Sequence, residues 1–171
     1  MVILQDTREK CNFHQNITDG LTALGHKVNR TKLYVGDYTL PTNQSVCIDV
    51  KQNMAEIYSD IVGRQHERFI RELKRAQEAG IRLIVLIEQG GIDSVQDVAN
   101  WRNPRIERWF KIRDGKLRGG YRNVNIPKEP PVSSERLAKA MQTISERYGC
   151  EWMFCEPWRT VHVICEVLGI E

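Results

Sequence analysis

The stretch that decides the fold is GDYTLPTNQSVCIDVK, residues 36–51. Residues 41–44, at its middle, have the composition of a turn, and residues 46–48 are typical of a β-strand. The pattern predicts that residues 33–51 form two antiparallel strands joined by a loop. The chemistry that this hairpin carries then depends on which side chains share a face.

Two carboxylates and an ammonium group are expected to meet on one face of the hairpin. Side chains alternate along a strand, so Asp49 and Lys51 share one face and Val50 lies on the other. A loop centred near Asn43 places Asp37 across from Asp49. Crowded carboxylates favour a divalent cation between them, and a lysine beside them can orient or deprotonate a water. This layout is typical of a metal-dependent phosphodiesterase, although Gly-Asp turns and Asp-x-Lys edges also occur without any catalytic role.

Length and composition fit a globular protein. A chain of 171 residues is expected to form one domain with its own core. No apolar run is long enough to span a bilayer, and the N-terminal residues lack the layout of a signal peptide, so we expect a cytoplasmic protein with no membrane partner. The five cysteines include no Cys-x-x-Cys pair, which favours reduced, structural thiols.

Apolar periodicity predicts strands that alternate with helices along the rest of the chain. The run at residues 81–87 is almost continuously apolar, as in a strand buried on both faces. Gly63 is expected to divide or kink a helical pattern over residues 54–79. The other predicted elements are a strand at 2–4, a helix near 17–24, a short helix at 93–99, a helix from Ser133 or Ser134 to Tyr148, a strand at 150–155 and a helix from Pro157. The fold class is therefore α/β, with a mixed central sheet flanked by helices.

Residues 101–128 differ from the rest in composition. Their net charge is +7, which leaves −4 for the remainder of a chain whose total is +3. Gly115 and Gly119-Gly120 predict a loop or a hairpin, and aromatic residues are interleaved with the cations. Such a segment suits phosphates and exposed bases, an interpretation we favour over a solvated insertion. The candidate DNA contacts are Arg102, Arg105, Arg108, Lys111, Arg113, Lys116, Arg118 and Arg122.

The order of the short motifs resembles the nuclease domain of the XPF-type structure-specific endonucleases, within the broad PD-(D/E)XK nuclease class. Motifs cover about residues 1–90, and residues 133–171 match more loosely as a closing helix–strand–helix. The motifs are Asp6-Thr7-Arg8-Glu9 after the first strand, Gly36-Asp37-Tyr38, Asp49-x-Lys51, Gly63-Arg64, and a strand that ends in Leu86-Ile87-Glu88.

The resemblance implies a restriction-endonuclease-like fold and a role for each matched residue. Asp6 and Glu9 match the first acidic motif of the family, and Asp37 matches its metal-binding aspartate. Asp49 and Lys51 match the glutamate and the lysine of its Glu-Arg-Lys motif. The arginines of the matched motifs, Arg8 and Arg64, are candidate DNA contacts, with a structural role as the alternative for Arg64.

Three positions depart from the family pattern. Asp49 replaces glutamate and shortens the reach of the carboxylate, while Val50 stands where the family has arginine. Ala55 stands where the family often has aspartate, and the adjacent Glu56 is expected to project elsewhere. The family's helix-hairpin-helix domain has no counterpart in the sequence, so we expect residues 101–128 to supply DNA affinity.

The sequence therefore predicts an endonuclease that uses Mg²⁺ or Mn²⁺, held by Asp37 and Asp49. The expected substrate is branched or flap-like DNA, or a junction of single and double strands, in repair or recombination. The resemblance also implies a homodimer. Two alternatives stay open: a catalytically silent nuclease fold that binds DNA or a partner chain, and an α/β nucleotide-binding protein that uses Gly90-Gly91.

Overall fold

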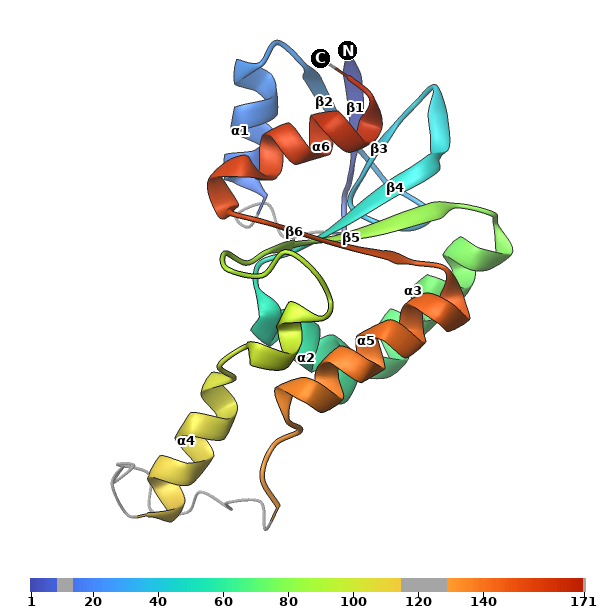
Figure 1. Ribbon diagram of the computed structural model, residues 1–171. Coiled ribbons are helices and arrows are strands. Elements are labelled where there is room, and N and C mark those ends of the chain that lie inside the picture. The colour runs from blue at the N-terminus through green and yellow to red at the C-terminus, as the bar shows by residue number, and fades with distance from the viewer. Residues whose placement is uncertain (9–13, 115–128, 171) are drawn as a thin grey trace.

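A mixed six-stranded sheet forms the centre of the computed structural model, which describes residues 1–8, 14–114 and 129–170 (Figure 1). The strand order is β2-β1-β3-β4-β5-β6, and β3 runs antiparallel to both its neighbours while the other pairs are parallel. The strands are β1 (Val2–Asp6), β2 (Lys27–Thr31), β3 (Tyr38–Leu40), β4 (Asn43–Lys51), β5 (Arg82–Glu88) and β6 (Glu151–Cys155). The predicted α/β class is confirmed.

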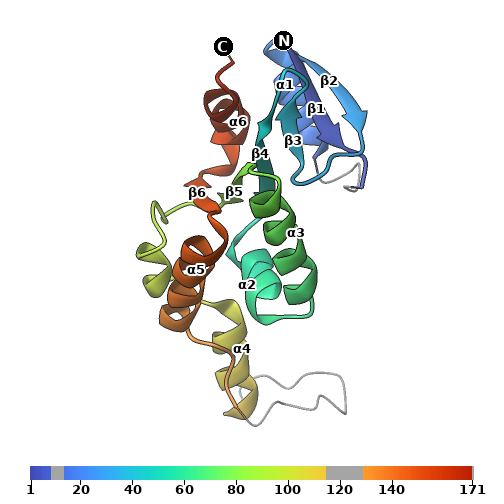
Figure 2. The same cartoon turned by 90° about the vertical axis from the view of Figure 1, so that its right-hand side faces the viewer.

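Helices cover both faces of this sheet, and each face has its own apolar cluster (Figures 1 and 2). One cluster joins the sheet to α2, α3 and α5, and the other joins it to α1 and α6. The helices are α1 (Gln15–Ala23), α2 (Met54–Val62), α3 (His66–Glu78), α4 (Pro104–Arg113), α5 (Ser134–Tyr148) and α6 (Thr160–Leu168), with short 3₁₀ turns η1 (Asp97–Asn100) and η2 (Pro157–Arg159).

The hairpin has the register that the sequence predicts. Tyr38 pairs with Ile48, and the backbone N–H of Asp37 donates to the carbonyl of Ile48 at 2.7 Å, so Asp37 lies across from Asp49. Alternation along β4 is equally clear, because Cys47 belongs to the cluster under α2, α3 and α5 while Val50 belongs to the cluster under α1 and α6. The hairpin therefore presents Asp37, Asp49 and Lys51 on the side of α2 and α3.

The division of the long helical pattern at Gly63 is also confirmed. Helix α2 ends at Val62 and α3 begins at His66. A Cβ on Gly63 would lie 2.7 Å from the carbonyl oxygen of Ser59, so no side chain fits where the chain turns. Helix α2 begins with a cap, since the side chain of Asn53 accepts hydrogen bonds from two backbone N–H groups of its first turn.

The first strand of the hairpin is shorter than expected, because β3 covers only Tyr38–Leu40 and residues 33–37 are not in a strand. Three further elements differ from the sequence-based expectation. Strand β2 is not predicted, because its residues are mostly exposed and carry no apolar alternation. Residues 104–113 form helix α4 instead of a loop, and residues 115–128 of the same segment lie outside the described residues. The short helix expected at 93–99 is a 3₁₀ turn over Asp97–Asn100.

Helix α4 projects away from the sheet, at the end of the molecule opposite to the two termini (Figure 2). Its start carries ordinary signals for a helix: Asn103 accepts a hydrogen bond from the N–H of Arg105, and Pro104 is its first residue. Among the described residues, no helix combines the length and the apolar character that crossing a membrane requires.

Candidate active site

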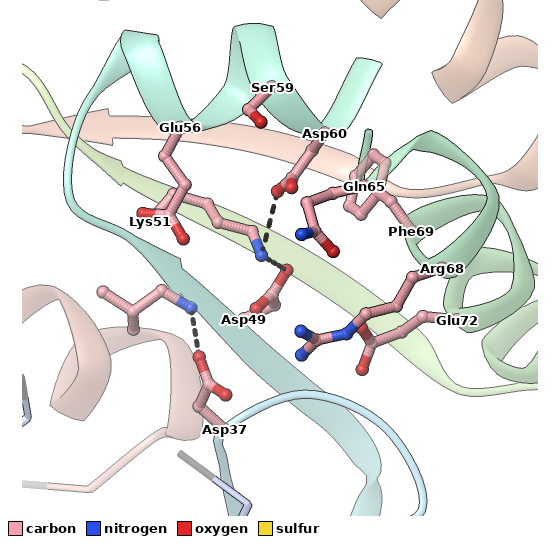
Figure 3. Close-up of a pocket in the computed structure, with 11 residues that line it drawn as sticks. Asp37, Asp49, Lys51, Glu56, Ser59, Asp60, Gln65, Arg68, Phe69 and Glu72 are labelled. Carbon is pink, nitrogen blue, oxygen red and sulfur yellow. Dashed lines mark hydrogen bonds and ion pairs between the residues drawn. The ribbon is translucent and has the colours of Figure 1, made fainter. Parts of the chain in front are cut away.

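A polar pocket of about 240 Å³ opens where the end of β4 meets α2 and α3 (Figure 3). The hairpin contributes Asp37, Asp49 and Lys51 to its lining, and α2 contributes Glu56 and Asp60. The further side chains come from α3 and the turn before it, and from Ser59 of α2. The structure thus brings together the three residues that the hairpin pattern singles out.

Three neighbouring residues fix Asp37 in the pocket wall. Gly36 has φ +69°, and a Cβ there would lie 2.9 Å from the carbonyl oxygen of Ile48, so glycine lets the two strands approach. The Asp37 carboxylate accepts a hydrogen bond from the N–H of Val50 at 2.8 Å. On the other side, Tyr38 is fully buried, and its hydroxyl oxygen lies 2.8 Å from His14 Nδ1. The glycine and the tyrosine of the Gly-Asp-Tyr motif therefore hold Asp37 in position.

Two carboxylates pair with Lys51 at the centre of the pocket. Its Nζ lies 2.9 Å from Asp49 Oδ2 and 3.2 Å from Asp60 Oδ2, and only 12% of its side chain is exposed. The ring of Phe69 lies beneath the same ammonium group, 5.6 Å away. These neighbours leave the amine little freedom to move.

The carboxylates decide the protonation state of Lys51. Burial by itself lowers its pKa, but the charges of Asp49, Asp60 and Asp37 outweigh burial and raise the pKa well above the usual lysine value. The amine therefore stays protonated at neutral pH. In this protonated form it can donate hydrogen bonds and stabilise negative charge.

Glu56 and Asp60 are site residues that sequence reasoning missed. The expectation that Glu56 projects elsewhere is wrong, because its carboxylate lines the pocket and accepts a hydrogen bond from the N–H of Gln52. Burial raises the pKa of Glu56. The hydrogen bond from the backbone N–H of Gln52 and the charge of Lys51 offset part of this increase. The sequence contains one indication of this pair: Glu56 and Asp60 are four residues apart, which places both on one face of α2.

Asp6, from the first acidic motif, lies beside the main pocket and not in it. Asp6 lines a smaller adjoining pocket of about 30 Å³, which it shares with Asp37 and Asp49. Its two oxygens are engaged, one by the N–H of Leu33 at 3.0 Å and the other by Arg8 Nε at 2.6 Å. Glu9 lies outside the described residues.

The candidate DNA contacts that the structure describes do not line the main pocket. Arg64 is exposed between α2 and α3. In the basic segment, Arg102 pairs with Glu107, while the guanidinium groups of Arg105 and Arg113 lie over the rings of Tyr58 and Trp109 at 5.1 and 4.9 Å. All four cations of α4 are exposed, and Arg108 and Lys111 are the two without a ring beneath them among the described residues. Lys116, Arg118 and Arg122 lie outside the described residues.

The pocket suits a hard divalent cation that takes only a few of its ligands from the protein. No cluster of three or more His, Cys, Asp or Glu side chains in the described ranges has the arrangement of a metal cage. Mg²⁺ seldom uses such cages, because it keeps several waters and binds one or two carboxylates together with substrate phosphates. Asp37 and Asp49, which line one pocket, supply that donor set.

A mixed sheet that brings two acidic side chains and a lysine to one pocket defines a nuclease-like α/β fold. The family model described as the ERCC4 domain matches residues 5–166, so the chain belongs to the ERCC4-domain family. This agrees with the motif order, and the resemblance to XPF-type nuclease domains is confirmed.

Solved structures with the same fold include XPF from Aeropyrum pernix and the same protein in a complex with DNA. Both superpose with a TM-score of 0.58, at 20% and 18% sequence identity. Each comparison covers 98% of this chain but only 63% of the XPF chain, so the sequence spans less than two thirds of that relative. No curated protein sequence shows significant similarity to the chain.

Proposed function

We propose that the chain is a metal-dependent DNA endonuclease that cuts branched or flap-like DNA, or a junction of single and double strands. The observation that carries the proposal is the hairpin face on which Asp37, Asp49 and Lys51 line one pocket in an ERCC4-domain chain. The relative from Aeropyrum pernix has been solved in a complex with DNA, which supports DNA as the ligand. A role in DNA repair or recombination follows from the same family relationship.

Asp37 and Asp49 would hold Mg²⁺ or Mn²⁺, which when bound polarises the scissile phosphate and lowers the pKa of a coordinated water. The carboxylates are pre-positioned: Asp37 by the N–H of Val50, and Asp49 by its place opposite Asp37 on β4. Asp6 supports this wall of the pocket indirectly, because its two oxygens are engaged by Arg8 and by the N–H of Leu33. The catalytic role of Glu9 stays a prediction.

Lys51 is proposed to position the attacking water and to offset the charge that develops on the phosphate. Its raised pKa keeps it charged through this step. Asp60 gives the ammonium group a second carboxylate, so Lys51 keeps a partner when Asp49 is engaged elsewhere. In this proposal Asp60 holds Lys51 while Asp49 holds the cation.

The departure at Val50 does not speak against activity. Its side chain is 3% exposed and packs in the cluster on the far face of the sheet. An arginine there would point away from the pocket. The catalytically silent alternative is therefore weaker than the sequence alone allowed, and cleavage remains the direct test.

A panel of end-labelled DNAs with identical arm sequences tests the proposal. Single strand, duplex, 3′ flap, 5′ flap, fork and four-way junction are each incubated with Mg²⁺, Mn²⁺ or a chelator. We expect cleavage of at least one branched form with metal, none with chelator, and none by the Asp49→Asn variant. Cleavage that persists in that variant would overturn the site, and no cleavage of any DNA would leave the silent binding module.

A homodimer belongs to the same proposal, by analogy with the family. Sedimentation equilibrium over a range of concentrations tests it independently of activity. A monomer at every concentration would contradict the dimer and leave the nuclease proposal standing.

A further inference from the structure

Helix α3 carries a row of arginines that neither the motifs nor the basic segment include. Arg68, Arg71 and Arg75 are spaced three and four residues apart, so their side chains lie on one face of the helix. Arg68 and Arg71 are exposed, and Arg75 is half-buried. A row of this kind could be an ordinary solvated helix face, so its position and its partners decide its meaning.

The position of the row ties it to the carboxylates. Arg68 lines the main pocket together with Asp37 and Asp49, and its side chain extends toward them (Figure 3). Arg75 and Arg68 both line the smaller adjoining pocket, which also contains Asp37 and Asp49. The row therefore starts inside the candidate active site and continues along α3.

Two of the three arginines, Arg71 and Arg75, keep their charges available to a ligand. Within the part of the chain that the structure describes, Arg71 and Arg75 form no ion pair, and Arg75 Nε is buried without any hydrogen-bond partner. Glu72, the carboxylate nearest in sequence that also lines both pockets, is engaged by the N–H of Gly36 at 3.0 Å. Buried donors are nearly always satisfied, so this guanidinium nitrogen is expected to meet a partner from outside the chain, either a water or an anion such as a phosphate.

The length of the row fits several consecutive phosphates. Seven residues separate Arg68 from Arg75, which is about 10 Å along a helix that rises about 1.5 Å per residue. One strand of a nucleic acid carries a phosphate about every 3.4 Å along the helix axis, so the row spans about three phosphates. Guanidinium groups bind phosphate oxygens in a bidentate manner, which suits arginine better than lysine at such positions.

We infer that Arg68, Arg71 and Arg75 form a phosphate track that guides one DNA strand into the carboxylate pocket. This inference rests on the proposed function for the identity of the ligand. It assigns the positioning of the cut strand to α3, and leaves the basic segment with a separate share of the affinity. Arg68 sits at the end of the track where the strand meets Asp37 and Asp49.

Salt dependence of DNA binding tests the track, measured by fluorescence anisotropy with Ca²⁺ in place of Mg²⁺. The Arg71→Ala/Arg75→Ala variant is compared with Lys27→Ala/Arg159→Ala, which removes two exposed cations from β2 and from the start of α6. Two lost phosphate contacts flatten the slope of log affinity against log salt by about 1.8 for duplex and about 1.4 for single strands. We expect that change in the α3 variant and a much smaller one in the control.

Two further variants protect the test from a folding defect. Arg71→Ala alone removes an exposed side chain and is expected to flatten the duplex slope by about 0.9. The Arg71→Lys/Arg75→Lys variant keeps the charges and is expected to restore most of the parent slope. A parent slope in the Arg71→Ala variant, or an equal effect in the control, would overturn the track. If the parent binds DNA but cuts none of the panel, the nuclease proposal fails while the track stands.

Discussion

Lys51 shows how a buried cation can be kept charged without being left free to move. Its ammonium group sits between Asp49 and Asp60, and Phe69 closes the third side. A lysine buried without these carboxylates would lose its proton more easily. Two acidic residues of the pocket therefore fix the protonation state and the position of one amine. Asp37 lines the same pocket.

Removing the charge of either hairpin carboxylate is expected to abolish cleavage but not folding. In Asp37→Asn the new amide oxygen can still accept from the N–H of Val50, and in Asp49→Asn Lys51 keeps Asp60. Loss of one of several crowded like charges also relieves repulsion. Single-turnover cleavage with Mg²⁺ should become undetectable in both variants, while the melting temperature changes little.

Lys51→Ala is expected to lower single-turnover cleavage by a factor of about 10² to 10³, the usual cost of losing one electrostatic donor. Glu67→Gln is the matched control for these variants, because Glu67 is exposed on α3 and lines neither pocket. A control that cuts as slowly as Lys51→Ala would show that the loss comes from general charge effects.

Stability should fall in mild acid because of His14. Burial, with further contributions from Lys51 and Arg30, lowers its pKa to about 4 from an ordinary value of 6.5. Between these values the unfolded chain binds more protons, so the stabilisation is complete above pH 6.5 and is lost as pH falls toward 4. Through His14, lowering the pH from 7 to 5 is expected to reduce the free energy of unfolding by about 2 kcal/mol.

Urea unfolding at pH 7 and pH 5 measures this effect. His14→Gln should lose about 2 kcal/mol less than the parent over that interval, because its side chain does not titrate. The exposed His66 provides the control, and His66→Gln should follow the parent. Equal pH dependence in the parent and in His14→Gln would show that His14 is not the responsible group.

The sequence could identify Asp37, Asp49 and Lys51 because one hairpin relates them. Alternation and a turn of known position are local facts, and they determine the shared face. Glu56 and Asp60 come from α2, whose rotation against β4 is set by packing of its buried residues in the core. The spacing within α2 is visible in the sequence, but the direction in which that face points is not.

At the scale of elements, β4 presents its candidate catalytic residues on one face of the sheet and Val50 on the other. Val50 is buried against the cluster of α1 and α6, while Asp49 and Lys51 on either side of it face the opposite layer. We therefore expect Val50→Arg to lower the free energy of unfolding by about 3 to 5 kcal/mol, because a charge is buried without a partner. Gln44→Arg, at an exposed position of the same strand, should cost much less.

Thermal melting and cleavage of the Val50→Arg variant decide between two interpretations. A lower melting temperature without faster cleavage supports the packing role. An unchanged melting temperature together with faster cleavage would mean that this position can serve the site as the arginine does in the family.

Elements with strong apolar patterns were the predictable ones. Strand β5 and helix α5 are buried along a continuous run and a periodic face, respectively, and both patterns are visible in the sequence. Strand β2 is exposed along most of its length and is held by pairing with β1, which leaves no hydrophobic signature. Helix α4 is short and has a single buried residue, Trp109, so the glycines after it dominated the expectation of a loop.

At the scale of the whole molecule, the two groups of described cations that are proposed to contact DNA lie apart from each other. The arginine row of α3 adjoins the pocket, whereas α4 extends away from the sheet (Figures 1 and 2). Trp109, one of the aromatic residues interleaved with the cations, is only 6% exposed and is therefore not available to stack on bases. Phe110 is the exposed aromatic residue of α4, with 51% of its surface accessible.

Helix α4 is expected to supply a share of the DNA affinity. Arg108→Ala/Lys111→Ala should flatten the salt slope by up to about 1.8 for duplex and about 1.4 for single strands, if both cations contact phosphates. Cleavage at saturating DNA should fall little, because neither residue lines the pocket. Phe110→Ala should weaken single-stranded and branched DNA more than duplex, since only unpaired bases offer a free face for stacking.

Binding titrations at several salt concentrations, with Ca²⁺ to prevent cleavage, supply both comparisons, and Lys27→Ala/Arg159→Ala again removes two exposed cations elsewhere. Combining the α3 and α4 variants adds a sharper question. If one DNA contacts both surfaces, the slope changes add, because the two sites share no residues. If the α4 variant keeps the parent slope while the α3 variant loses its share, α4 serves packing or a partner chain, and the strand that is cut depends on α3 alone.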